Sequence, residues 1–113
     1  MRYPSEVMKG LTPLLVLQAL SEAELGGLSV LRRVRQLTSD QIDIPDGTIY
    51  PLLYRLEAQG ALVGRWHAEP GKRRQRLYRL TDRGRTMLAA DRTAWTGLVA
   101  AVSGFLSGKE LRS

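Results

Sequence analysis

Three segments in the first half of the chain carry hydrophobic residues three or four positions apart, which is the spacing of one face of a helix. They predict a helix from about Ser5 to Leu20, a second from about Leu28 to Leu37, and a third that opens near Asp46 and stops at Gly60. In the first segment Pro13 either kinks the helix or marks its true start, because proline disturbs a helix interior but not a first turn. The expected buried stripe of the second helix is Leu28, Leu31, Val34 and Leu37.

The third segment separates hydrophobic from polar positions. Asp46 and Thr48 are both good N-cap residues, and if Thr48 caps the helix, Pro51 falls in the first turn, where its missing N–H costs nothing. Gly60 is a typical residue at the end of a helix. The expected inward stripe is Ile49, Leu52, Leu53 and Leu56, which leaves Thr48, Tyr50, Tyr54 and Arg55 facing outward.

After residue 60 the pattern changes from helical spacing to short alternating segments. Leu62–Ala68 and Arg74–Leu80 predict two strands, and the Pro70-Gly71 pair between them predicts a turn, so we expect a β-hairpin with a basic tip. A last helix is expected from Thr81 to about Leu106. Its hydrophobic positions are Leu88, Trp95, Leu98, Val99, Val102, Phe105 and Leu106.

A chain of 113 residues is long enough for one domain with a thin core. No hydrophobic run approaches the roughly 18 residues of a membrane span, and the start of the chain lacks the pattern of a signal peptide. The absence of cysteine fits a reducing cytoplasm. We therefore expect a cytoplasmic α+β protein, mostly α, in which residues 1–81 form three helices and a hairpin, residues 82–107 form a C-terminal helix, and residues 108–113 form a disordered tail.

All of the net charge of +6 comes from one stretch, residues 65–85. This stretch holds eight basic residues and two acidic ones, whereas the rest of the chain holds nine of each. A local basic cluster indicates a polyanionic partner, since the neutralisation of phosphates releases counterions. The alternative is a solvated surface that keeps the protein soluble. Charge alone does not decide between the two.

Three helices followed by a two-stranded hairpin is the order of a winged helix-turn-helix. In that fold the third helix presents hydrogen-bonding groups to base edges in the major groove, and the hairpin, or wing, brings positive charge to phosphates. The outward residues of the third helix and the basic hairpin tip meet both requirements. The predicted contacts with double-stranded DNA are Thr48, Tyr50, Pro51, Tyr54, Arg55, Lys72, Arg73 and Arg74.

Four sequence segments extend this interpretation: KGL at residues 9–11, DGTIYPLLYRLE at 46–57, QGAL at 59–62 and KRRQRLYRLTDRG at 72–84. Together they resemble the PadR family of bacterial transcriptional regulators, over about residues 8–106. The block GTIYP followed by RLE is the distinctive part, whereas RLTxxG recurs in other winged-helix families. The single helix after the wing resembles the short subfamily. Where the family often has His-Gly-Tyr, this chain has Gly26-Gly27-Leu28, so any contact made by that His or Tyr is absent.

The resemblance implies a homodimeric, sequence-specific repressor that occupies a promoter operator. We expect the last helix to form the dimer, because no later element of the chain covers its hydrophobic stripe. The expected interface residues are Leu88, Trp95, Leu98, Val99, Val102 and Leu106. Trp95 is also a candidate contact for a small aromatic effector, because some family members bind flat aromatic ligands in this region.

Several candidates have a structural alternative. Tyr50 and Tyr54 are alternatively half-buried packing residues, and Arg55 alternatively pairs with Glu57 or Asp43. We expect the remaining candidates to lie on the strand surface, in the case of His67, Arg76 and Arg79, or in the core, in the case of Trp66.

No Ser-His-Asp arrangement, carboxylate pair or glycine-rich phosphate loop stands out, and one histidine without cysteines or clustered acids does not make a zinc site. We therefore expect no enzymatic activity, no metal, no cofactor and no membrane partner. The alternative to DNA binding is a winged-helix interaction module whose hairpin and third helix bind an acidic protein. Salt-dependent binding to duplex DNA separates the two functions.

Overall fold

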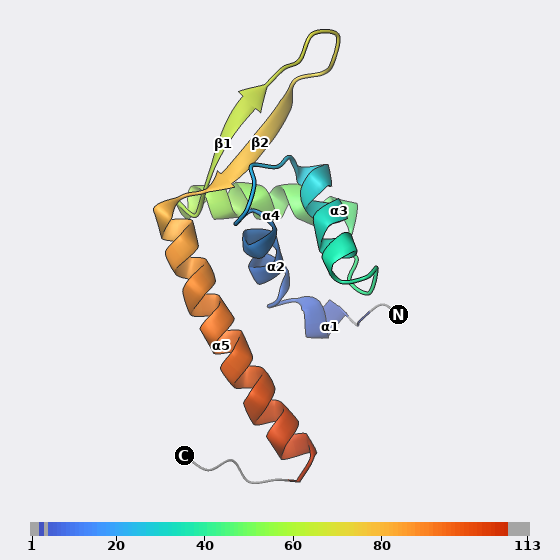
Figure 1. Ribbon diagram of the computed structural model, residues 1–113, viewed down its shortest axis with the longest axis vertical. Helices are drawn as coiled ribbons and strands as arrows, with labels where there is room; N and C mark the ends of the chain where they lie inside the picture. The colour runs from blue at the N-terminus through green and yellow to red at the C-terminus, as the bar shows by residue number, and fades with distance from the viewer. Residues whose placement is uncertain (1–2, 4, 109–113) are drawn as a thin grey trace.

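A computed structural model describes Tyr3 and residues 5–108 of the chain. Four longer helices and a two-stranded sheet follow a short first helix, and Figure 1 shows the hairpin and the last helix projecting from opposite ends of a compact helical body. The molecule is 59 Å long and 21 Å thick. The expected fold, mostly helical α+β with a two-stranded wing, is confirmed. The expected disordered tail lies, apart from residue 108, outside the described residues.

The first predicted helix is divided in two. Helix α1 (Ser5–Met8) is a single turn, and α2 (Thr12–Ala19) starts afresh, with Pro13 in its first turn. A first turn tolerates proline because its N–H groups have no partner within the helix. The prediction of one helix from 5 to 20 is therefore wrong, and the alternative that Pro13 marks the true start is confirmed.

Helix α3 (Gly27–Leu37) begins one residue before the predicted start, but its buried face differs from the predicted stripe. Leu28 and Leu37 are 53% and 66% exposed, whereas Val30, Leu31 and Val34 are buried. A strict three-residue repeat turns back by about 60° at each step of a helix with 3.6 residues per turn. Leu28 and Leu37 therefore lie on opposite sides of the helix and cannot share one buried face.

Helix α4 (Asp46–Ala58) buries the predicted stripe of Ile49, Leu52, Leu53 and Leu56. It opens at Asp46, as predicted, but the expected cap was wrong: the N-cap residue is Pro45, which offers no side-chain hydrogen bond, and both Asp46 and Thr48 lie inside the first turn. Pro51 consequently sits in the helix interior, where it removes one backbone hydrogen bond.

The end of α4 follows the prediction. Gly60 has a φ of +80°, a conformation that favours glycine. Its N–H donates to the Glu57 carbonyl at 3.0 Å, and the N–H of Ala61 donates to the Leu56 carbonyl at 2.9 Å. This pair of bonds is a Schellman motif, which satisfies the last helical carbonyls and turns the chain into the hairpin.

Strands β1 (Leu62–His67) and β2 (Gln75–Leu80) form the antiparallel hairpin, each one residue shorter at the tip than predicted. Leu62 pairs with Leu80 at the base, and His67 pairs with Gln75 near the tip. Leu25 adds an isolated bridge to β2: its N–H donates to the Tyr78 carbonyl at 3.0 Å, and the Tyr78 N–H donates back at 2.9 Å. The base of the wing is thereby tied to the segment before α3.

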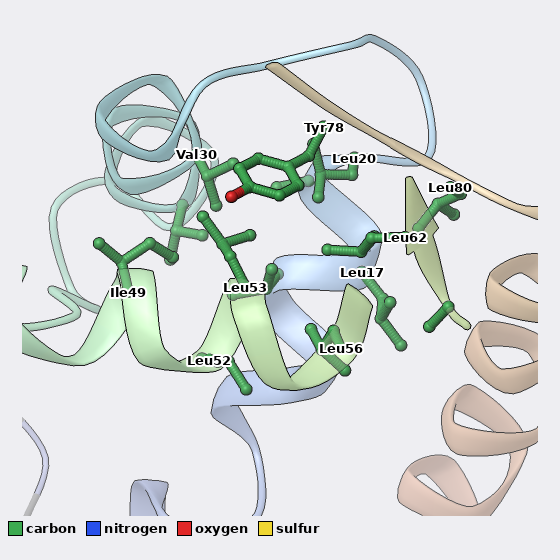
Figure 2. Packing of buried hydrophobic residues seen from close by; sticks show 14 of the residues in the cluster. Leu17, Leu20, Val30, Ile49, Leu52, Leu53, Leu56, Leu62, Tyr78 and Leu80 are labelled. Atoms are coloured by element: carbon green, nitrogen blue, oxygen red, sulfur yellow. The ribbon is translucent and has the colours of Figure 1, made fainter. Parts of the chain in front are cut away.

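The core lies where α2, α3, α4 and the base of the wing meet. Tyr78 is its largest fully buried side chain, and Figure 2 shows the ring among Val30, Leu20 and Leu53. The other buried hydrophobic residues are Val16, Leu17, Ala19, Leu31, Val34, Ile44, Ile49, Leu52, Leu56, Ala61, Leu62, Leu80 and Leu88.

Helix α5 (Asp82–Leu106) begins where predicted, with Thr81 as its N-cap. Its first turns pack on α2, and beyond them it leaves the body (Figure 1). Leu88 is buried in the core of the protomer itself, so its assignment to the exposed dimer stripe is wrong. No helix among the described residues is both long enough and apolar enough to cross a membrane.

Candidate nucleic-acid interface

Helix α4 presents a polar and aromatic face to solvent. Tyr50 and Tyr54 are 39% and 57% exposed, with ring centroids 6.4 Å apart and planes tilted by 40°. Because they follow each other by four residues, they lie one above the other on the helix. Thr48, Pro51 and Arg55 are exposed as well. All five predicted contacts of this helix are therefore accessible, and the two tyrosines are not enclosed in the core.

Arg55 does not pair with Glu57, which was one of its predicted alternatives. Glu57 instead accepts a hydrogen bond from Arg76. Arg55 forms no ion pair with any other residue that the structure describes. Its guanidinium therefore keeps its donors available, and a planar group with five donors suits a base edge or a phosphate.

The wing tip carries three consecutive basic residues in three different environments. The Lys72 ammonium lies 3.2 Å from the Glu69 carboxylate. Arg74 stacks over the Trp66 ring, with its Cζ atom 4.6 Å from the ring centroid. Arg73 is exposed, and within the described part of the chain it has no ion pair. Arg73 is thus the least engaged cation of the tip.

Trp66 corrects the prediction that placed it in the core, because it is 54% exposed. Strand alternation puts Trp66 on the same face of β1 as the buried Leu62. The hairpin extends past the helices toward its tip (Figure 1), so this face loses its cover along the strand. The ring is covered instead by Arg74 and by Arg76, whose Cζ atom lies 5.4 Å from the centroid.

The basic stretch 65–85 is partly neutralised by carboxylates from other elements. Arg65 on β1 makes a bidentate contact with Glu24, with Nε–O distances of 2.9 Å and an Nη2–Oε1 distance of 2.6 Å. The hydrogen bond from Arg65 lowers the pKa of the Glu24 carboxyl below its usual 4.5. Lys72 and Arg76 of the same stretch also have carboxylate partners. Among the described residues, Arg73 and Arg79 are two of the cations of the stretch that form no ion pair.

Glu57 joins α4 to the wing, a contact that sequence reasoning missed. Its Oε2 atom accepts from the Arg76 guanidinium at 2.8 Å and from the Gly64 N–H at 3.1 Å. Arg76 was predicted to lie on a solvated strand face, but its side chain is only 27% exposed. The only signal in the sequence is an acid near the end of one element and a base 19 residues later, which does not specify a pair.

His67 lies at the strand surface as predicted, with its Nε2 atom 3.5 Å from the Glu69 carboxylate. Among the described residues, no group of three or more His, Asp or Glu side chains is placed to hold a metal ion. A solvent-open hollow of about 730 Å³ lies between α2, the loop before α4, and α4 itself. Its walls include Thr12, Ile42, Thr48 and Arg55, and Trp95 is not part of its lining.

Helix α5 displays a hydrophobic stripe beyond the body of the protomer. The stripe consists of the five remaining predicted interface residues: Trp95, Leu98, Val99, Val102 and Leu106, which are between 40% and 78% exposed. These positions are three or four residues apart and share one side of the helix. Unlike Leu88, none of them is buried among the described residues.

Comparison with known proteins adds to this geometry. The model of the transcriptional regulator PadR-like family matches residues 16–90. Transcriptional regulator Rv3488 of Mycobacterium tuberculosis is 40% identical over 70 residues, which are 62% of this chain and 64% of that protein. The match thus spans a little less than two thirds of that relative's length.

Solved structures of other transcriptional regulators share the fold of this chain. A PadR family transcriptional regulator from Eggerthella lenta is 33% identical with a TM-score of 0.77, and the alignment covers 89% of this chain and 86% of that one. A transcriptional regulator from Clostridium thermocellum reaches a TM-score of 0.82 at 24% identity, covering 89% and 98%, a likeness of fold alone. These matches confirm the resemblance found in the sequence motifs and the winged-helix fold. The family and these relatives are transcriptional regulators, not enzymes.

Proposed function

The chain belongs to the PadR-like family of transcriptional regulators, and from this membership we propose that it represses transcription as a homodimer bound to a promoter operator. PadR-like regulators bind DNA. The observation that carries the proposal for this chain is the exposed face of α4, with Arg55 free of ion pairs among the described residues, together with the unpaired cation Arg73 at the tip of the wing.

On this proposal, α4 lies in the major groove and reads base edges, while the wing meets the phosphates beside it. The helix contacts are Thr48, Tyr50, Pro51, Tyr54 and Arg55, and the wing contacts are Lys72, Arg73 and Arg74. Lys72 reaches a phosphate by leaving Glu69, a rearrangement that costs little because exposed ion pairs are weak. Repression follows from occupation of the promoter, which excludes the polymerase.

The dimer forms through the stripe of α5, and residues 82–107 act as the dimerisation helix. Exposure of five hydrophobic side chains on one helix face to water is unfavourable in a monomer, and burial against a second copy removes this cost. A two-fold axis also places two recognition helices about one turn of DNA apart, roughly 34 Å. Residues 1–81 act as the DNA-binding unit, with Leu88 as the point where α5 is fastened to it.

Trp95 is the proposed contact for a small aromatic effector. An aromatic residue near a two-fold axis occurs twice in the dimer, and such a pair stacks a flat molecule between its rings. Titration with planar hydrophobic dyes tests this role through the fluorescence of Trp95, in a Trp66→Phe background that removes the other tryptophan. Unchanged Trp95 fluorescence at saturating dye would contradict it.

The decisive experiment is selection of bound sequences from a pool of random duplex DNA with the purified protein. We expect enrichment of a two-fold symmetric sequence with half-sites about one helical turn apart. Sedimentation at micromolar concentration should show a dimer. Enrichment of no sequence, together with salt-dependent capture by acidic proteins, would instead support the interaction module. A monomer at that concentration would refute the dimer.

A further inference from the structure

A chain of charged and aromatic contacts runs from the recognition helix to the tip of the wing. It starts at Glu57 on α4, passes through Arg76 on β2 and Trp66 on β1, and ends at Arg74 beside the tip. We call these four side chains the wing latch. We propose that Glu57 is a positioning residue: through the latch it fixes the angle of the wing relative to α4, so that both elements engage one DNA duplex.

One carboxylate holds both strands of the hairpin. The Oε2 atom of Glu57 accepts from the N–H of Gly64 on β1 at 3.1 Å and from Nη2 of Arg76 on β2 at 2.8 Å. The side chains of Glu57 and Arg76 are only 28% and 27% exposed, so the pair is less screened than an ion pair in open solvent. The core and the Leu25 bridge hold the base of the hairpin, and Glu57 adds one contact to each strand, which restrains the direction of the part nearer the tip.

Gly64 leaves the room that the latch needs. A Cβ atom at this position would lie 2.7 Å from Nε and 2.9 Å from Cζ of Arg76. The Arg76 guanidinium therefore crosses the face of β1 directly over a residue without a side chain. The same guanidinium also contacts the ring of Trp66, the residue that pairs with Arg76 in the register of the two strands. Strand register, the missing side chain and the Glu57 carboxylate all determine the same position of Arg76.

The Trp66 ring connects Arg76 to Arg74, because both arginines contact it. The guanidinium carbons of Arg76 and Arg74 lie 5.4 and 4.6 Å from the centroid of its ring, and such cation–π contacts hold planar cations against the aromatic face. Arg74 directly follows Arg73 in the sequence. The basic tip is thereby linked, side chain by side chain, to the end of the helix that reads DNA.

The inference rests on the proposed function, and the sign of its effect distinguishes it from simple electrostatics. Glu57→Gln removes a negative charge, which by itself strengthens binding to a polyanion. Disruption of the latch has the opposite effect, because a misaligned wing no longer reaches its phosphates. A matched control is Glu22→Gln, which makes the same change in charge and breaks an ion pair with Arg33 on α3, a pair that includes no residue of the hairpin.

The anisotropy is measured on the full chain carrying Trp95→Phe, so that Trp66 is the sole tryptophan, whereas DNA binding is measured with Trp95 in place, because Trp95 belongs to the proposed dimer stripe. In the free protein we expect Glu57→Gln to lower the fluorescence anisotropy of Trp66, and Glu22→Gln to leave it unchanged. On duplex DNA, Glu57→Gln should bind more weakly than its parent. The slope of log affinity against log salt should fall by about 0.9 for each phosphate that the wing no longer neutralises.

Arg76→Gln breaks the same ion pair from the wing side and repeats the anisotropy test should Glu57→Gln fail to fold. Its DNA affinity does not enter the test, because the loss of a positive charge weakens binding to a polyanion by itself. The double variant should show no larger drop in anisotropy than the more affected single variant, because both changes break the same ion pair. Unchanged anisotropy in both single variants overturns the proposal. A lower anisotropy with an unchanged salt slope also overturns it, since the wing is then held without consequence for DNA. If the parent protein binds no duplex, the proposed function fails, whereas the anisotropy of the free protein still reports whether the latch holds the wing.

Discussion

Gly84 lies so close to Ala61 that a Cβ atom at position 84 would come within 2.1 Å of the Ala61 carbonyl oxygen. The same joint is held by Thr81, whose hydroxyl accepts from the Gly84 N–H at 3.0 Å and donates to the Gly60 carbonyl at 2.6 Å. The Thr81 N–H donates to the Ala61 carbonyl at 3.0 Å. The TxxG spacing at residues 81–84 is therefore a packing requirement, because it seats α5 against the turn between α4 and the wing.

Gly84→Ala should destabilise the fold by about 1–3 kcal/mol or more, because the added methyl group would clash with backbone atoms and no flexible side chain can move aside. The measurement is urea unfolding followed by circular dichroism. Gly97→Ala on the same helix is the control: apart from the adjoining backbone of α5, no described atom lies within 4 Å of its added methyl group, and we expect it to stabilise by up to about 1 kcal/mol. Equal effects of the two substitutions would contradict the close approach of Gly84 to Ala61.

Tyr78→Phe should leave the protein as stable or make it more stable by about 1 kcal/mol at neutral pH. The Tyr78 hydroxyl is buried, and it has no hydrogen-bond partner among the described residues. Burial also raises the pKa of Tyr78 above its usual 10.0. The stability that the neutral phenol contributes is thus complete below pH 10 and is lost as the pH rises toward the folded value.

The phenylalanine variant should therefore resist alkaline unfolding better than its parent. The check is the urea midpoint at neutral pH and again above about pH 10, with Tyr54→Phe as an exposed control expected to stay within about 0.5 kcal/mol. A clear decrease in the stability of Tyr78→Phe at neutral pH would mean that the hydroxyl is satisfied in solution.

The Glu24 carboxyl should titrate below its usual pKa of 4.5, because the Arg65 guanidinium hydrogen-bonds to its ionised form. A depressed pKa stabilises the fold above the unfolded value, and this contribution disappears as the pH falls through the folded value. Carbon-detected NMR titration of the glutamate side chains measures it. In Arg65→Gln the pKa should return toward 4.5. An unchanged value in that variant would assign the shift to another group.

The features that could be predicted from the sequence are those set by local periodicity and turn chemistry. The stripe of α4, the Gly60 stop and the two strands each follow from residues that are neighbours in the chain. The predicted buried stripe of α3 was wrong for a geometric reason, since positions three residues apart drift around a helix. The first segment was ambiguous because Pro13 fits both a kink and a start, and only the packing of α2 decides.

Parts of the site depended on how far each element extends beyond the body. Trp66 is hydrophobic and lies on the inward face of β1, yet it is exposed because the wing extends beyond the helices at this point. Leu88 belongs to the hydrophobic positions of α5, yet the first turns of that helix pack on α2 and bury it. The Glu57–Arg76 pair joins residues 19 positions apart, and no periodicity specifies such a pair.

Trp95→Ala should weaken the proposed dimer by about 3 kcal/mol or more if the second copy buries the ring completely, by analogy with the removal of a large aromatic side chain from a core. Trp95 is 41% exposed in the protomer, so the interface has a large part of the ring left to cover. Sedimentation equilibrium over a concentration series measures the change. Phe105→Ala is a useful comparison, since Phe105 is 82% exposed and lies outside the five-residue stripe. A smaller effect of Trp95→Ala than of Phe105→Ala would place the interface on another face.

The last prediction separates the roles of the wing and the recognition helix on DNA. Arg73 at the tip should contribute mainly non-specific affinity, because phosphates look alike at every base pair. Arg73→Ala should therefore weaken binding to the selected operator and to random duplex about equally. The slope of log affinity against log salt should fall by about 0.9 for each phosphate left without its arginine in each subunit.

Arg55→Ala should behave differently, because Arg55 lies on the exposed face of α4 with its donors unused by any ion pair among the described residues. If it reaches a base edge, its removal costs about 1–3 kcal/mol on the operator and little on random DNA. Arg83→Ala, an exposed arginine on α5 outside the hydrophobic stripe, controls for the removal of one positive charge. A salt series on both duplexes decides the assignment. Selectively weaker operator binding in Arg73→Ala, with equal weakening on both duplexes in Arg55→Ala, would reverse it, because the wing would then read sequence and the helix would set only the position.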